Sequence, residues 1–96
     1  MLEELGATPD EVAAALRAAG IRGVRNTARF LNPIVRYAST VLKDAQQIDL
    51  MRGDALRTVF ADGRVREFTL PAAVLQFLEA FHRGGYPDLE VPAGGA

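Results

Sequence analysis

The sequence predicts a small α+β domain whose elements follow the order helix, helix, three antiparallel strands, helix. Apolar residues recur at helical spacing in two stretches before residue 43 and in one stretch after residue 70. Between residues 47 and 69 they alternate instead, as in a strand, and a hairpin signal divides this stretch. A chain of 96 residues has room for one hydrophobic core. We therefore expect a single domain over residues 1–90 and a flexible, glycine-containing tail over residues 91–96.

The first helix is expected from Pro9 to Ala19. Thr8 is suited to cap its start, Pro9 suits the first helical position, and Glu11 can complete a capping box with Thr8. Gly20 is a typical residue just after a helix end. The apolar stripe of this helix consists of Val12, Ala15, Leu16 and Ala19. We expect this stripe to face the core.

A second helix is expected from Pro33 to Lys43. Asn32 and Pro33 repeat the order of a cap followed by a first-turn proline. The apolar stripe of this helix consists of Ile34, Tyr37, Ala38 and Val41. Glycines interrupt the sequence before it, so residues 20–32 are expected to form an irregular loop.

Three strands are expected after the second helix. The first contains Ile48 and Leu50 on either side of Asp49, and residues 52–54 have the composition of a turn. The second is expected over residues 55–61, which contain the strand-forming residues Thr58, Val59 and Phe60. These strands should be antiparallel neighbours, because the connection between them is short.

A two-residue turn is expected at Asp62-Gly63, because glycine and, to a lesser extent, aspartate adopt the positive φ of a type I′ turn. This turn predicts that Phe60 pairs with Val65. The third strand is then expected from Arg64 to Thr69. Phe68 has the opposite phase to Val65, so this strand is expected either to contain a bulge or to have two apolar sides.

The last helix is expected to begin at Leu70-Pro71 and to end before Gly84-Gly85. Its apolar stripe, the most hydrophobic of the chain, consists of Val74, Phe77, Leu78 and Phe81. A three-stranded sheet is not stable with both faces in water, so we expect the helices to cover one face. The residues expected to meet in this core are Leu56, Phe60, Phe77 and Phe81. Residues 86–89 are expected to fold back on the domain.

Two stretches carry a family resemblance. The first consists of Gly20-Ile21-Arg22-Gly23, the helix start Pro33-Ile34 and Tyr37. The second consists of Leu70-Pro71, Val74, Phe77, Phe81, Gly84, Tyr86-Pro87 and Leu89. On these residues the chain resembles a set of short bacterial proteins, mostly from high-GC lineages, for which no activity is known. Those proteins often carry cysteine where this chain has Asn32, so a thiol role at that position is absent here. The resemblance implies a shared fold and no particular activity.

The composition excludes several classes of function. The chain has no cysteine, which excludes disulfides, thiolate zinc sites and thiol catalysis. No apolar run approaches the about 20 residues that span a bilayer, and the acidic start does not resemble a secretory signal, so we expect a cytoplasmic protein without membrane contact. His82, the single histidine, lacks partners for a metal site and is expected to favour the end of the last helix as a cation. No catalytic residue, metal site or cofactor is predicted.

The charge distribution points to an anion-binding segment. No acidic residue occurs after residue 11 and before residue 44, although the net charge of the whole chain is only −1. The candidate anion-binding residues are Arg22, Arg25, Arg29 and Arg36. Guanidinium groups bind phosphate and carboxylate, and the free N–H groups at the start of the second helix would add positive potential. The alternative is that these arginines are solvated or pair with the acids Glu3, Glu4, Asp44 or Asp49.

The preferred hypothesis for function is a non-catalytic protein-interaction module or small subunit, which binds another protein or its own copy as a homodimer. The last helix carries surplus apolar surface and the first strand is expected at a sheet edge, so both are candidate contacts. The candidate interface residues are Val74, Leu75, Leu78, Ile48 and Leu50. The alternative is a regulator that binds a phosphate ligand or nucleic acid through the segment from Arg22 to Arg36, which the near-neutral charge makes less favourable.

Overall fold

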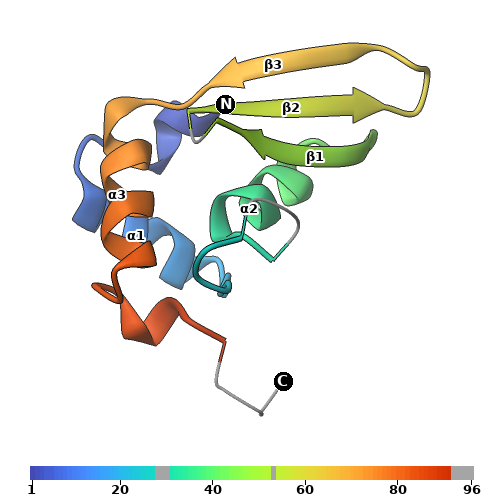
Figure 1. Cartoon of the computed structure of the whole chain (residues 1–96). Helices are drawn as coiled ribbons and strands as arrows, with labels where there is room; N and C mark the ends of the chain where they lie inside the picture. Colours follow the sequence, from blue (N-terminus) through green and yellow to red (C-terminus); the bar gives the residue numbers. More distant parts are fainter. Residues whose placement is uncertain (28–30, 53, 92–96) are drawn as a thin grey trace.

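The structure is a computed structural model that describes residues 1–27, 31–52 and 54–91. It confirms the α+β class, with helices before and after a three-stranded antiparallel sheet (Figure 1). The helices are α1 (Pro9–Ala18), α2 (Pro33–Val41) and α3 (Ala72–His82), and the strands are β1 (Ala45–Met51), β2 (Ala55–Phe60) and β3 (Val65–Thr69). Two short 3-10 helices, η1 (Leu2–Leu5) and η2 (Pro87–Leu89), were not expected. Over the described ranges, no helix combines the length and apolar character needed to cross a membrane.

Helix α1 begins as the sequence predicts and ends one residue earlier, at Ala18. The Thr8 hydroxyl accepts a hydrogen bond from the backbone N–H of Glu11 at 3.2 Å. The Glu11 carboxylate accepts one from the N–H of Ala7 at 2.7 Å. The expected return bond from Glu11 to Thr8 is therefore replaced by a bond one residue further back. Helix α2 ends at Val41, before the expected end at residue 43, because the next residue leaves the helical conformation.

Asn32 fixes both the start of α2 and the loop before it. Its side chain is fully buried. Its Oδ1 atom accepts hydrogen bonds from the backbone N–H groups of Ile34 at 2.9 Å and Val35 at 3.3 Å. Its Nδ2 group donates to the carbonyl of Thr27 at 2.9 Å. One amide therefore satisfies two helix N–H groups and holds the preceding loop against the helix.

The register of β3 differs from the predicted one by a single residue. Val65 lies opposite Val59, so the expected pairing with Phe60 is wrong. The N–H of Phe60 donates to the carbonyl of Arg64 at 2.8 Å, and the N–H of Gly63 donates to the carbonyl of Phe60 at 2.9 Å. These bonds enclose a loop of three residues rather than two. Gly63 has a φ of 89°, the left-handed conformation that closes a loop of this length.

This register assigns the apolar side chains of β3 to two faces of the sheet. Phe68 pairs with buried Leu56, and we call this the inner face. Val65 and Val59 lie on the opposite side, which we call the outer face. The pairing of β2 with β3 is regular, so β3 has two apolar sides and no bulge. Of the two expected alternatives for this strand, the first is wrong and the second is confirmed.

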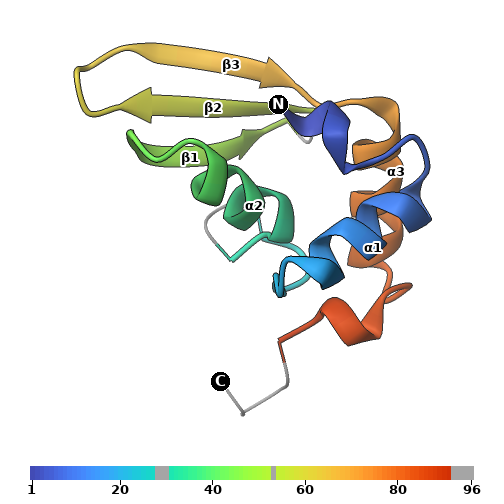
Figure 2. The same cartoon turned by 180° about the vertical axis from the view of Figure 1, so that it is seen from behind.

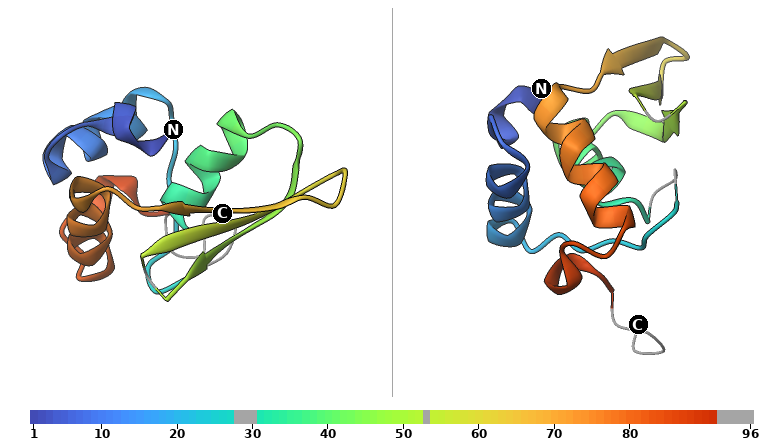
Figure 3. Two further views of the ribbon diagram at one scale, coloured as in Figure 1. Left: turned by 90° about the horizontal axis from the view of Figure 1, so that it is seen from above. Right: turned by 60° about the vertical axis from the view of Figure 1, so that its left-hand side comes forward.

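One helix covers the sheet and the other two lie beside it. Helix α2 packs against β1 on the inner face, in front of the strands in Figure 2. Helices α1 and α3 pack against each other at one end of the sheet, where both views of Figure 3 place them side by side. The expectation that all three helices cover the sheet is therefore wrong. Only two residues separate β3 from α3, so α3 continues from the strand end instead of crossing the inner face.

The core joins the helical pair to the inner face. Leu56, Phe77 and Phe81 are fully buried in one cluster, as predicted. The Phe77 ring stacks on Phe81 with centroids 5.8 Å apart and contacts the Tyr86 ring at 5.1 Å. Phe60 is buried but lies outside this cluster, with the guanidinium of Arg64 5.1 Å from its ring centroid. The expectation that Phe60 joins the common core is therefore wrong, because it required the helices to reach the hairpin end of the sheet.

The segment after α3, residues 86–91, folds back as expected; we call it the C-terminal segment. The N–H of Gly23 donates to the carbonyl of Leu89, and the N–H of Val91 donates to the carbonyl of Gly23, both at 2.9 Å. Leu89 is buried, and the Tyr86 hydroxyl donates to the Asp10 carboxylate of α1 at 2.7 Å. Val91, expected in the flexible tail, is therefore bonded into the domain. Residues 92–96 of that tail lie outside the described residues.

We expect Asn32→Ala to lower the free energy of unfolding by about 2 kcal/mol or more, because it removes a buried cap and a buried donor together. Thr8→Ala removes the cap of α1 at an exposed position and should cost about 1 kcal/mol. Urea denaturation of both variants measures the difference. An Asn32 variant that loses no more stability than the Thr8 variant would show that the buried amide does not anchor the loop.

Candidate functional site

The candidate anion-binding arginines do not converge on one site. The Nε of Arg25 forms an ion pair with the Glu90 carboxylate at 3.1 Å. Arg36 donates through Nη1 to the backbone carbonyl of Arg22 at 2.9 Å. Arg29 lies outside the described residues. Within the described part of the chain, Arg22 is the one member of this set whose guanidinium has no bonded partner.

The acids that neutralise the basic segment come from the C-terminal segment. Besides the Arg25–Glu90 pair, Arg17 of α1 forms an ion pair with Asp88. The hydrogen bond from Arg17 holds the pKa of Asp88 below its ordinary value. The expected partners Glu3, Glu4, Asp44 and Asp49 form no ion pair with an arginine in the described ranges. The prediction that the arginines pair internally is therefore right for Arg25, but the named partners are wrong.

A pocket of about 190 Å³ lies beside Arg22, between the end of α1 and the C-terminal segment. Its lining residues are Arg17, Gly20, Ile21, Arg22, Asp88 and Leu89. The Asp88 carboxylate and the negative end of the α1 dipole both face this region, and each disfavours an anion. The charges in the pocket are mixed, so its chemistry does not favour phosphate over a neutral solute or water.

His82 accepts a hydrogen bond instead of acting as a cation at the end of α3. Its Nδ1 atom accepts the backbone N–H of Asn26 at 2.9 Å, which requires this nitrogen to be deprotonated. Burial lowers the pKa of His82 below its ordinary value. Asn26 has a positive φ of 60°, so the bond supports an uncommon backbone conformation. The expected interaction of a charged imidazole with the helix dipole is therefore wrong. In the described ranges, no group of three or more metal-ligating side chains is close enough to hold a metal ion.

The predicted apolar interface is largely used inside the chain. Val74 and Leu78 belong to the core, because α1 packs against this side of α3. Leu75 is half-buried against the same core. On β1, Ile48 is buried and Leu50 is half-buried, since both point toward the inner face. None of these five residues presents a large exposed apolar surface.

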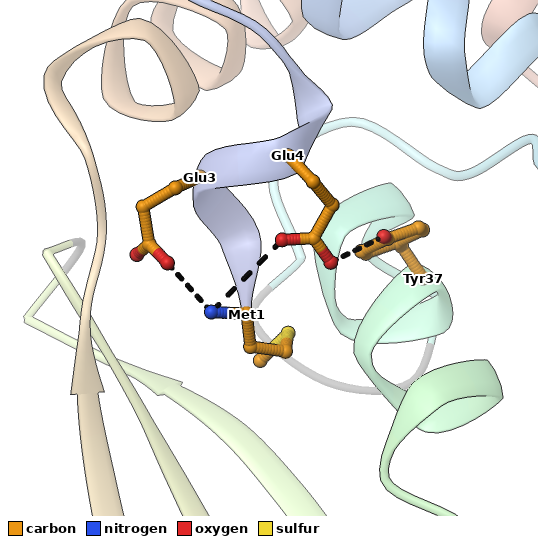
Figure 4. A network of polar contacts seen from close by, with 4 residues as sticks. All are labelled: Met1, Glu3, Glu4 and Tyr37. Carbon is orange, nitrogen blue, oxygen red and sulfur yellow. Dashed lines mark hydrogen bonds and ion pairs between the residues drawn. The ribbon is translucent and has the colours of Figure 1, made fainter.

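A polar network beside α2 holds η1 in place (Figure 4). The amine of Met1 forms an ion pair with Glu3 at 2.6 Å and lies 4.0 Å from a carboxylate oxygen of Glu4. The Tyr37 hydroxyl of α2 donates to Glu4 at 2.9 Å. Burial and this hydrogen bond raise the pKa of Tyr37. The network therefore joins η1 to α2.

A second, smaller pocket of about 120 Å³ lies between α2 and β1. Its lining residues are Val35, Ser39, Ala45, Gln46, Gln47 and Ile48. The Ser39 hydroxyl already donates to the carbonyl of Arg36 at 2.7 Å. Thr58, the β2 neighbour of Ile48, is fully buried, and its hydroxyl has no partner among the described residues. This pocket has the size for a few water molecules and has no charged side chain in its lining.

The free edge of the sheet is β3. Figures 1 and 2 show no element beside β3 on its side away from β2, whereas α2 packs against β1, the other edge strand of the sheet. The N–H of Leu70 donates to the carbonyl of Asp54 at 2.9 Å, and Phe60 and Arg64 are hydrogen-bonded at the other end of the ladder. Hydrogen-bonded pairs alternate along an antiparallel ladder. The backbone N–H and C=O groups of residues 65, 67 and 69 therefore point away from β2, toward solvent.

The side chains along this edge are also accessible. Val65 is 49% exposed, and Arg66, Glu67 and Thr69 are exposed as well. Only Phe68 is half-buried, on the inner face. The expected edge position of β1 is confirmed, because β1 and β3 are the two edge strands of the sheet, but the edge at β3 was not expected. The signal available in the sequence was the pair of charged residues in the middle of the third strand, which is typical of edge strands.

We expect the stability of the protein to fall as the pH drops below about 6.5, the ordinary pKa of histidine, because of His82. The pKa of His82 is lowered in the folded chain and is about 6.5 when unfolded, so the unfolded chain binds the proton first as pH falls. The contribution of neutral His82 is complete above about pH 6.5 and is lost as the pH falls through the folded pKa. The carboxyl groups with lowered pKa, Glu3, Asp62 and Asp88, titrate at lower pH.

Urea denaturation of the parent chain and of His82→Ala at about pH 7.5 and about pH 5.5 tests this expectation. The variant should be less stable at the higher pH and should show a smaller loss on acidification than the parent chain. An equal pH dependence in both proteins would contradict the assignment.

Comparison with known proteins gives no relative. No family model, no curated protein and no solved structure matches this chain. The function proposed below therefore depends on the geometry of the described residues.

Proposed function

We propose that this protein is a non-catalytic interaction module that binds an extended segment of another protein along the free edge of β3. The observation that supports the proposal is the row of outward N–H and C=O groups at Val65, Glu67 and Thr69. An extended chain placed beside β3 would become a fourth strand and pair with these groups. The other edge strand of the sheet, β1, is longer, but α2 packs against it.

The other surfaces named by the sequence support binding less well. The apolar side of α3 is covered by α1, and β1 is bordered by α2. By contrast, β3 is five residues long and four of its side chains are exposed. A binding edge must be accessible in both its backbone and its side chains, and β3 meets both conditions.

The expected affinity is modest. Three residues with outward N–H and C=O groups allow up to six main-chain hydrogen bonds, each with a net contribution of about 0.5–1.5 kcal/mol. Association and ordering of a flexible segment oppose this gain by several kcal/mol. A dissociation constant on the order of micromolar or weaker follows, which suits a reversible contact.

The alternative, binding of a phosphate ligand or nucleic acid through the basic segment, has less support. Arg25 is paired with Glu90, and Arg36 is bonded to the backbone of Arg22. Among the described candidate arginines, Arg22, Arg25 and Arg36, only Arg22 has a guanidinium without a bonded partner, and it lies beside Asp88. Phosphate titration at low salt tests this alternative, because binding through these arginines should weaken as salt is added.

We expect Glu67→Pro to abolish strand addition while the domain stays folded. The N–H of Glu67 points outward, so proline there removes a donor for a partner strand and leaves the β2–β3 hydrogen bonds intact. The matched control, Glu67→Ala, removes the same charge and keeps the N–H. Peptides are first selected for binding to the parent chain from a random displayed library. Their dissociation constants for Glu67→Ala should lie within a few-fold of those for the parent chain, and their dissociation constants for Glu67→Pro should be at least tenfold higher.

Thermal unfolding confirms that each variant is folded, and Thr69→Pro gives a second test at the same edge. If the selected peptides bind both proline variants as tightly as the parent chain, β3 is not the binding edge. A library that yields no binding peptide at all would also count against the proposal.

A further inference from the structure

We infer the charge order of the strand that β3 accepts, an inference that rests on the proposed function. The strand is an extended segment of another protein and runs antiparallel to β3. It carries a basic residue opposite Glu67, followed directly by an acidic residue opposite Arg66. The inference depends on how charges are arranged in the two rows of side chains that cross the sheet at these positions.

The row on the outer face alternates in charge. Asp49 of β1 lies opposite Arg57 of β2, and Arg57 lies opposite Glu67 of β3. Arg57 and Glu67 are exposed, so this row continues to the free edge in contact with solvent. Directly opposed side chains on neighbouring strands are close enough to interact, with opposite charges favourable and like charges unfavourable. A lysine or arginine on the added strand beside Glu67 extends the alternation.

The row on the inner face ends in an unpaired cation. Ile48, Thr58 and Arg66 lie opposite one another across the three strands, so the first two positions are uncharged. The Arg66 guanidinium lies over the Phe68 ring, 5.1 Å from its centroid. Among the described residues, no carboxylate lies within ion-pair distance of Arg66. An aspartate or glutamate on the added strand would supply the missing countercharge at a partly apolar position.

The order of the two charges follows from the direction of the added strand. The existing sheet is antiparallel throughout, and antiparallel pairing is slightly more stable per residue than parallel pairing. A partner that runs antiparallel meets Glu67 before it meets Arg66. Its basic residue therefore precedes its acidic residue, and apolar residues on either side lie opposite Phe68 and Val65.

A second copy of this chain fits the edge less well. Two β3 strands paired about a twofold axis at residue 67 place the two Glu67 side chains opposite each other, and an axis at residue 66 does the same for the two arginines. An axis at residue 68 avoids like charges but leaves Val65 beyond the paired region and forms no ion pair. Charged side chains on an edge strand are a recognised means of preventing self-association.

The test uses two blocked synthetic peptides of identical composition. Both are β-branched and apolar at the flanking positions, and they differ only in carrying Lys-Glu or Glu-Lys at the centre. Each is titrated into the isotope-labelled full chain at low salt, and the backbone amide signals of Val65, Glu67 and Thr69 are followed by NMR. We expect the Lys-Glu peptide to bind about tenfold more tightly than the Glu-Lys peptide. The reversed order in Glu-Lys replaces two favourable cross-strand charge pairs with two unfavourable ones.

The preference should shrink as salt screens the charges. It should reverse in the double variant Arg66→Glu with Glu67→Arg, and the single variants Arg66→Gln and Glu67→Gln should each lower it. Both substituted residues, Arg66 and Glu67, are exposed, so the substitutions do not enter the core.

The outcomes separate this inference from the proposed function. Equal binding of both peptides at β3, or tighter binding of Glu-Lys, would overturn the charge order and leave strand addition intact. If neither peptide moves the β3 amide signals, strand addition itself fails. A dimer of the parent chain in sedimentation experiments that Glu67→Pro abolishes would identify a second copy as the occupant and overturn the inference.

Discussion

The backbone conformation of Gly63 sets the register on which the rest of this protein depends. Its left-handed φ closes a loop of three residues and pairs Val65 with Val59. A one-residue change in register would move every β3 side chain to the opposite face. Phe68 would then leave the inner face and Glu67 would enter it. The same turn decides which backbone groups of β3 bond to β2 and which face solvent, so the core and the free edge have a common origin.

The second organising feature is the way the fold recombines charges that the sequence separates. The stretch without acids between residues 11 and 44 meets its counter-ions in the C-terminal segment, where Asp88 and Glu90 bind Arg17 and Arg25. Exposed ion pairs of this kind contribute at most about 1 kcal/mol each. Burial of Leu89 and the two backbone bonds to Gly23 hold the segment in place more effectively. The arginine-rich stretch is therefore in part a structural partner of the chain end.

The arrangement of helices explains why a single strand is left open. Helices α1 and α3 bury their apolar surfaces against each other at the end of the sheet, and α2 covers the inner face along β1. No helix is left to cover β3, so the outer face and the free edge of this strand both meet solvent. An antiparallel sheet tolerates one wet face, so this arrangement is stable as it stands. It also leaves a short, charged strand edge available for a partner.

The sequence by itself determined the elements of this protein, because their signals are local. Thr8 and Asn32 mark the helix starts, the apolar stripe of α3 marks a buried helix, and Asp62-Gly63 marks the hairpin. Only the tertiary structure decided how these elements use their surfaces. It buried Val74 and Leu78 in the core, gave Arg25 a partner from the C-terminal segment, and placed α2 against the edge strand β1 while β3, the other edge strand, has no such neighbour. Periodicity shows that a residue has a buried side but not which element buries it, since that choice depends on loop length, register and the direction in which each helix leaves the sheet.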